Sequence, residues 1–197
     1  MTTRTDIARP HRLGIRGAQR TARWAQFALA VGAASSVAEA GLLVFTKAGD
    51  GSGDFKYTAD YWLTGVGIPA ALASFALLIA VRRIQDGQDG RLGLVGLVIN
   101  NLACLLLAVQ LATGVATASE VRWGPSYPLA TLAAFVGISL FAAGSWRVGV
   151  FPRWMLAAWP VVWVIGSMAA IGATPLLLTA YYVAMATVLT RPTALRP

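Results

Sequence analysis

Residues 92–112 read LGLVGLVINNLACLLLAVQLA, a stretch that contains no charged side chain. In a helix that rises about 1.5 Å per residue, a stretch of this length covers about 30 Å, the thickness of the hydrocarbon core of a bilayer. Similar stretches precede and follow it, and hydrophobic residues make up 57% of the 197-residue chain, against 12% charged residues. The sequence therefore predicts an all-α, polytopic membrane protein that folds as a helical bundle.

The apolar stretches predict six membrane-spanning helices joined by short loops. The last two are divided only by a turn, which Gly172, Thr174 and Pro175 supply within a segment free of formal charge. An undivided helix over this segment would be much longer than one crossing requires. The predicted spans are Trp24–Phe45, Tyr61–Val81, Leu92–Ala112, Tyr127–Trp146, Trp154–Ala173 and Pro175–Leu189.

Basic residues are distributed unevenly between the two sets of alternating loops. All of the 16 Lys and Arg residues fall on one set except Lys47, Lys56 and Arg122. Because cytoplasmic loops are enriched in Lys and Arg, both termini are predicted to be cytoplasmic. The domain organisation is then a basic cytoplasmic tail (1–23), a transmembrane domain (24–190) and a second cytoplasmic tail (191–197). Abundant Arg and Ala with little Lys suggest a bacterial protein of the cytoplasmic (inner) membrane.

From Arg9 to Arg23 the chain carries arginine at every third or fourth position, which places these residues on one face if the segment is helical. We expect this face to contact the anionic headgroups of the inner leaflet, and an ordinary topogenic tail is the alternative. Nucleic acid is not an expected partner, because the only aromatic residue near the tail is Trp24, at the membrane edge. The candidate headgroup residues are Arg12, Arg16, Arg20 and Arg23.

Glu39 is the one acidic residue well inside a predicted span. Removal from water disfavours a charged carboxylate, so an ionisable group at this depth is a functional candidate by default. Counted from Trp24, it lies about 22 Å from the cytoplasmic edge. Gly32, Ser35 and Ser36 give the same helix a small, polar face that another helix can approach closely. The alternative is a protonated carboxyl that only hydrogen-bonds a neighbouring helix.

Other polar residues inside the spans complete a candidate ligand site. Two amides lie near the bilayer centre in the third span, and two tyrosines reach the depth of the acid in the sixth. Successive helical residues differ in direction by about 100°, so the amides of the third span, Gln110 included, cannot all line one cavity. At least one should be an interhelical contact. The predicted ligand-binding residues are Glu39, Asn100, Asn101, Tyr181 and Tyr182.

The composition excludes several kinds of chemistry. Cys104 is the single cysteine and His11 the single histidine, so disulfides, redox pairs, haem ligation and multi-histidine metal sites are unavailable. The chain contains no P-loop and no intramembrane protease motif. We expect neither a metal nor another cofactor.

Three stretches of the chain carry a resemblance to a known family. They are Ala38-Glu39 late in the first span after an Ala22-Arg23 start, the Asn100-Asn101-Leu102 amides, and the loop from Trp146 to Trp154. Together they resemble a family of small six-span bacterial membrane proteins with a domain of unknown function, whose signature Arg-x-Gly-x-x-Pro-Arg-Trp is similar to this loop. The resemblance implies six helices and an inner-membrane location, and it implies no reaction.

From these features we expect a protein that binds or moves a small lipophilic or protonatable compound, with Glu39 as its principal polar contact. One alternative is a membrane-embedded cyclase or isomerase that acts on an isoprenoid-like substrate, with Glu39 as the catalytic proton donor. Another is an accessory subunit of a membrane complex, as a homo- or hetero-oligomer that docks through its small-residue faces. The sequence leaves open whether the protein is an enzyme.

Overall fold

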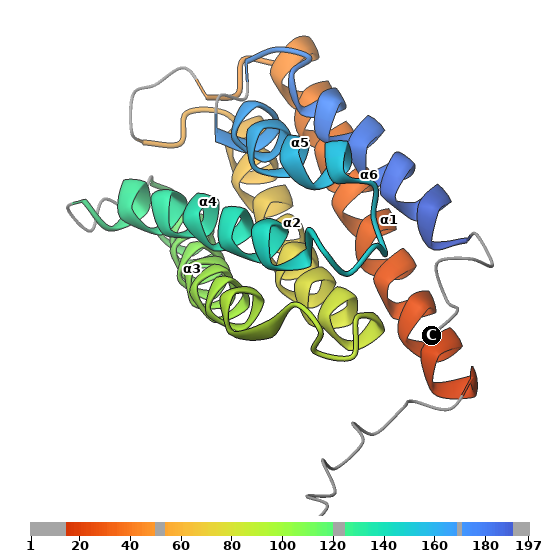
Figure 1. Cartoon of the computed structure of the whole chain (residues 1–197). Helices are drawn as coiled ribbons and strands as arrows, with labels where there is room; N and C mark the ends of the chain where they lie inside the picture. Colours follow the sequence, from red (N-terminus) through yellow and green to blue (C-terminus); the bar gives the residue numbers. More distant parts are fainter. Residues whose placement is uncertain (1–14, 50–53, 120–124, 169–170, 191–197) are drawn as a thin grey trace, which may run out of the picture.

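The computed structural model describes residues 15–49, 54–119, 125–168 and 171–190, and these residues form helices without a strand (Figure 1). The predicted all-α class is therefore confirmed. Each predicted span corresponds to a helix, and the fifth ends in a π-helical turn. The elements are α1 (Ile15–Phe45), α2 (Thr58–Ile84), α3 (Gly90–Thr117), α4 (Ser126–Ser145), α5 (Arg153–Trp163), η1 (Val164–Met168) and α6 (Pro175–Leu189).

Four of these helices, α1 to α4, are long and apolar enough to cross a membrane, and α6 is a shorter apolar helix. The helix α1 begins at Ile15 and not at the membrane edge predicted at Trp24. Six of the nine added residues, 15–23, are alanine, glutamine or arginine, which are good helix formers, so the helix continues into the basic segment without a break. Figure 1 shows this part of α1 extending past the ends of the neighbouring helices.

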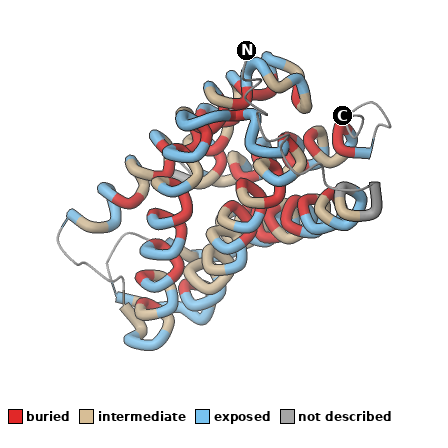
Figure 2. Tube along the Cα trace, turned by 60° about the horizontal axis from the view of Figure 1, so that its bottom comes forward, coloured by how far each residue is buried: buried red, intermediate tan, exposed pale blue. Residues whose placement is uncertain are grey.

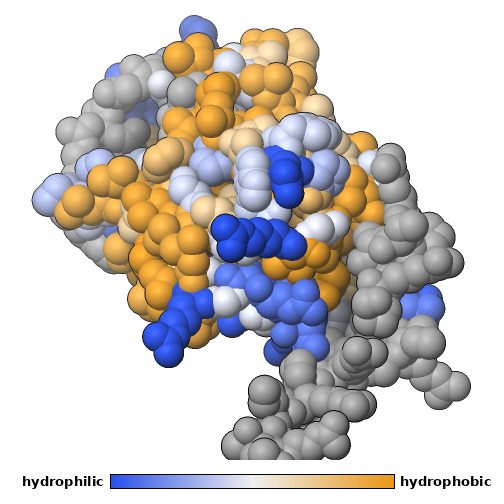
Figure 3. Space-filling view, viewed as in Figure 1, coloured by the Kyte–Doolittle hydropathy of each residue, from blue (hydrophilic) through white to orange (hydrophobic). Residues whose placement is uncertain are grey.

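The helices pack in a bundle in which α1 contacts α2 and α6, α2 contacts α3, α3 contacts α4, and α4 contacts α5. Figure 2 shows buried positions on the inward faces and exposed positions on the outside. Large apolar side chains such as Phe45, Trp62 and Leu102 are exposed, and Figure 3 shows apolar residues over much of one face, with hydrophilic residues gathered in its middle and lower part. An apolar periphery of this kind suits a bundle whose surroundings are lipid.

Glycines set the close approach of α3 and α4. A Cβ on Gly137 would lie 2.5 Å from the backbone nitrogen of Asn100, and a Cβ on Gly96 would lie 2.4 Å from that of Phe141. Two helices whose backbones are this close exclude any larger residue at the contact, as is common between membrane helices.

A group of polar residues, the base cluster, joins α2, α3 and α4 at one end of the bundle; Gln85, Asp89 and Ser145 are buried and Arg82 is partly exposed. The guanidinium of Arg82 donates to the Asp89 carboxylate, and the Ser145 hydroxyl donates to Gln85 Oε1 at 3.1 Å. Burial raises the pKa of Asp89, and the charge of Arg82 opposes this shift. The end of α2, the start of α3 and the end of α4 are therefore held together by polar contacts shielded from solvent.

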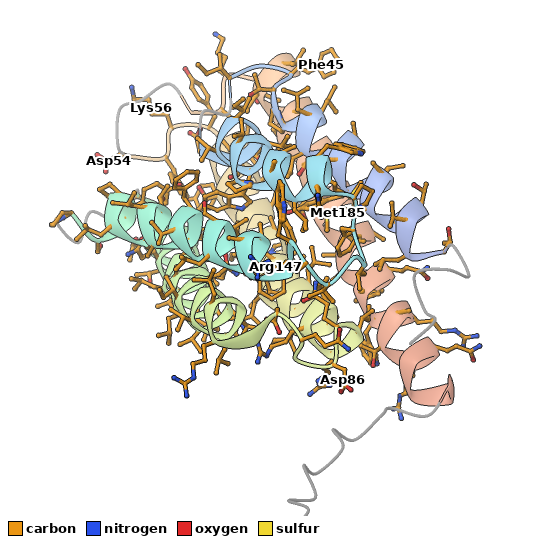
Figure 4. The ribbon with its side chains drawn as sticks, in the orientation of Figure 1. Phe45, Asp54, Lys56, Asp86, Arg147 and Met185 are labelled. Atoms are coloured by element: carbon orange, nitrogen blue, oxygen red, sulfur yellow. The ribbon has the colours of Figure 1, made fainter. Side chains whose placement is uncertain are left out.

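The opposite end of the bundle is tied by backbone hydrogen bonds. The Asp60 carboxylate accepts bonds of 2.9 Å from the backbone N–H of Lys56 and of two further residues in the loop between α1 and α2. The same loop reaches α3, because the Phe55 N–H donates to the Ala118 carbonyl at 3.0 Å. Figure 4 shows Lys56 at this end and Asp86 at the other. The end that carries Lys56 is called the loop end below.

Candidate functional site

A cavity of about 590 Å³ lies inside the bundle and extends to the loop end, where Gly49 and Ser119 form part of its wall. Residues from α1, α2, α3, α4, α5, η1 and α6 line it, and most of them are apolar or small. A mostly apolar cavity with a few polar groups is the usual form of a small-molecule site. The polar side chains of its wall are Ser36, Glu39, Thr64, Ser74, Cys104, Gln110, Ser119, Tyr127, Ser167 and Tyr182.

Glu39 is half-buried on α1 and faces this cavity. Within the described part of the chain, no hydrogen bond or ion pair engages its carboxyl. Ser36, one turn earlier, donates its hydroxyl to the Gly32 carbonyl at 3.0 Å, so this hydroxyl is already paired. The carboxyl of Glu39 is therefore available to a molecule in the cavity.

The two predicted tyrosines lie in different places. Tyr182 lines the cavity and packs so closely on α1 that a Cβ on Gly32 would lie 2.6 Å from its ring. The predicted small face of α1 thus admits α6. Tyr181 points to α5, where its hydroxyl donates to the Met155 carbonyl at 2.7 Å, and it is not among the described cavity residues. Tyr182 accompanies Glu39 at the site, whereas Tyr181 fastens α6 to α5.

Gln110 lines the cavity on α3 and is 2% exposed. Its Nε2 donates to the Ser126 hydroxyl at 3.0 Å, but its buried Oε1 has no hydrogen-bond partner among the described residues. A buried acceptor without a partner is unfavourable, and a donor supplied by a ligand would relieve it.

Asn100 and Asn101 are buried, but neither is among the described residues of the cavity wall. Asn100 donates to the Asn101 side chain at 3.4 Å, and its backbone lies against Gly137 of α4. The predicted difference in direction along α3 therefore separates Gln110, at the cavity, from the asparagine pair.

Cys104 is also part of the cavity wall and is 1% exposed. Its thiol interacts with the side chains of Ser74 on α2 and Asn100 on α3. These contacts are those of a small packing residue between two helices.

The sequence analysis did not identify the α2 residues that line the cavity. Thr64, Gly67, Ala71 and Ser74 all line the cavity. Their spacing of three, four and three residues places them on one helical face, so this stripe of small residues is the signal that would have indicated a wall. On the fifth helix, Trp163 also lines the cavity and was not predicted.

The two candidate headgroup residues whose side chains the structure describes lie away from the cavity. Arg20 and Arg23 are exposed on α1, and Arg23 precedes Glu39 by sixteen residues, which is about 24 Å along a helix. Arg16 belongs to the first turns of α1, and Arg12 lies outside the described residues.

Charge in the cavity is of one sign. Of the described residues that line it, Glu39 is the only one with a formal charge, and no Lys, Arg or His is among them. No group of three His, Cys, Asp or Glu side chains that could hold a metal ion occurs in the described ranges. The described residues thus form an all-helical bundle with four helices long and apolar enough to cross a membrane, and Glu39 is the only acid among those that line its internal cavity. No protein-family model, curated protein or solved structure matches the chain.

Proposed function

We propose that this protein is an integral membrane protein that binds or moves a small lipophilic or protonatable compound in the cavity beside Glu39. The observation that carries the proposal is the cavity of about 590 Å³, which Glu39 faces without a hydrogen bond or ion pair from any described residue. This volume lies in the range of cavities that enclose drug-sized ligands. Trp163 and Tyr182 offer aromatic surface to an apolar ligand.

The proposed threading has six crossings, with both termini on the cytoplasmic side of a bacterial inner membrane. The asymmetry of the basic residues supports it. In this arrangement α5 with η1, about 24 Å long, and α6, about 22 Å long, form a hairpin that supplies the last two crossings. The cavity then opens toward the extracytoplasmic side.

The exposed Arg20 and Arg23 would contact anionic headgroups of the inner leaflet. The Pro152-Arg153-Trp154 sequence would relate the chain to the six-span family that it resembles.

Photolabelling tests the proposed binding. The protein in nanodiscs is irradiated with a diazirine-bearing octanol, and the modified residues are mapped by mass spectrometry. The variant Ala71→Trp places a large side chain in the cavity from its wall on α2. The control Leu72→Trp places the same side chain at an adjacent position that is 45% exposed. We expect modification of Glu39 and its cavity neighbours, lost in Ala71→Trp and retained in Leu72→Trp. Modification confined to peripheral residues such as Leu102, or equal in both variants, would refute the proposal.

Movement of a ligand and its chemical conversion are separated by a second measurement. Proteoliposomes containing the protein are loaded with the octanol, and its release and chemical identity are followed with time. Release faster than from protein-free liposomes loaded in the same way supports transport. Conversion of the octanol to another compound identifies an enzyme that uses Glu39 as its acid.

A further inference from the structure

We propose that the compound held in the cavity is an amphiphilic organic cation with at least one N–H donor, bound between the Glu39 carboxylate and the Gln110 carbonyl oxygen. This inference rests on the proposed function and names its ligand class. It combines the charge of the cavity wall, an unpaired acceptor and the apolar remainder of the wall.

The charge of the wall selects the charge of the ligand. Glu39 faces the cavity without a hydrogen bond or ion pair from the described residues, and no basic side chain among them lines the wall. A carboxylate removed from water is stable when a cation pairs with it, and otherwise it takes up a proton. A ligand cation supplies the charged partner, an anion is repelled, and a neutral ligand meets the protonated carboxyl without gaining an ion pair.

Gln110 adds the requirement for a donor. The residue lines the cavity, its buried Oε1 has no hydrogen-bond partner among the described residues, and its Nε2 already donates to Ser126. Glu39 lies six residues before the end of α1 and Gln110 seven before the end of α3. Because the first and third helices run in the same direction, both groups lie about 10 Å inside the loop end. One ammonium group with several N–H donors is able to serve acceptors at a common depth.

The rest of the wall accommodates an apolar body. Leu107, Leu111 and Leu178 supply aliphatic surface, and Trp163 and Tyr182 supply rings that also attract a cation. A small inorganic cation would leave these apolar surfaces without a partner. The wall therefore fits an aromatic or aliphatic amine of drug size.

Four probes with one apolar body separate charge from donor capacity. They are 4-phenylbutylamine, its N,N,N-trimethyl derivative, 4-phenylbutanol and 4-phenylbutyrate. Binding to the full-length protein in phosphatidylcholine nanodiscs is measured by titration calorimetry, with empty nanodiscs subtracted. We expect the amine to bind at least tenfold more tightly than the alcohol, the trimethyl derivative to bind with intermediate affinity, and the butyrate to bind most weakly.

Substitutions of Glu39, Gln110 and Ser126 test which residue causes each difference in affinity between the probes. Glu39→Gln should remove the advantage of the amine over the alcohol and leave the binding of the alcohol within about twofold. Gln110→Met should remove the advantage of the amine over the trimethyl derivative. Ser126→Ala, which deletes the partner of Nε2 but keeps Oε1, should retain that advantage. The ranking of the probes on the wild-type protein decides the question even if a variant does not fold.

The outcomes distinguish this inference from the proposed function. If the alcohol or the butyrate binds as tightly as the amine, the inference is wrong and the proposed function stands. Equal binding of the amine and its trimethyl derivative overturns the donor assignment to Gln110. If none of the four probes binds while the diazirine-bearing octanol labels the cavity, the ligand class is wrong. If the octanol also fails to label it, the proposed function falls as well.

Discussion

The ring of Tyr182 lies over Gly32, where a Cβ would come within 2.6 Å of Cε2. This contact brings α6 against α1 and places the tyrosine in the cavity wall beside Glu39. A side chain at position 32 would have to displace a ring that is 5% exposed. The position of one glycine therefore contributes both to the packing of the bundle and to the shape of the site.

Gly32→Val should destabilise the protein by about 1–3 kcal/mol, because overpacking of a filled contact costs about that much. The measurement is the apparent Tm in detergent. Gly41→Val is the matched control on α1, since nothing lies within 4 Å of a Cβ there. Adding Tyr182→Ala to Gly32→Val should recover part of the loss, as expected of residues in contact. Equal Tm values for the two glycine variants would contradict the role of the contact.

An added methyl group should destabilise the crossing of α3 and α4 more than an added side chain destabilises the contact between α1 and α6. Gly137→Ala places its Cβ 2.5 Å from the backbone nitrogen of Asn100, which cannot rotate away as a side chain can. We expect a loss of about 3 kcal/mol, seen as a lower apparent Tm. Gly65→Ala, where a Cβ meets nothing within 4 Å, should be neutral or stabilising by up to about 1 kcal/mol. An unchanged Tm for Gly137→Ala would show that the helices separate without penalty.

The base cluster predicts that substitution of Asp89 and of Asp86, two acids of the loop between α2 and α3, will affect stability differently. Asp89 is 3% exposed and pairs with Arg82, whereas Asp86 is exposed. Asp89→Asn should cost about 2 kcal/mol, between the values for surface and buried pairs, because the Arg82 guanidinium loses its charged partner. Asp86→Asn removes the same charge from the loop and keeps a residue that tolerates its positive φ of 50°. Thermal unfolding that is alike for both variants would contradict a structural role for the ion pair.

Glu39→Gln should leave the apparent Tm unchanged or slightly raised. The carboxyl has no partner among the described residues, so the substitution breaks no contact and removes an acid that is costly to bury. Photolabelling at position 39 should fall in the same variant. A marked drop in Tm would indicate that Glu39 holds the bundle together, and the proposed site would then lose its principal residue.

The proposed threading can be tested with a membrane-impermeant maleimide, because the single native cysteine, Cys104, is 1% exposed and should not react. In intact cells, Lys47→Cys and Ile171→Cys should be labelled. Arg83→Cys and Arg147→Cys should be labelled only after the membrane is permeabilised. Ile171, in the turn before α6, is 77% exposed and reports on the last two crossings. Protection of Ile171→Cys, with Lys47→Cys labelled, would reduce the number of crossings to four.

Two of the residues predicted from the sequence to bind a ligand, Glu39 and Tyr182, lie in the cavity wall. Glu39 was recognisable because an acid in an apolar stretch stands out whatever surrounds it. Tyr182 was recognisable from its depth along the sixth span. Depth alone did not distinguish it from Tyr181, and composition did not distinguish Gln110 from the asparagine pair. Neighbouring residues of one helix share a depth, and only the packing of adjacent helices decides which of them meets a cavity.

What the sequence by itself determined is the set of helices and the asymmetry of charge, because the length of an apolar stretch and the content of a loop are local properties of the chain. The tertiary structure alone decided where a cavity remains. Gly32, Gly96 and Gly137 let particular helices approach closely, while small residues on α2 border a space that the described side chains do not fill. Such a space arises from the combined shape of several helices and has no signature in any one of them.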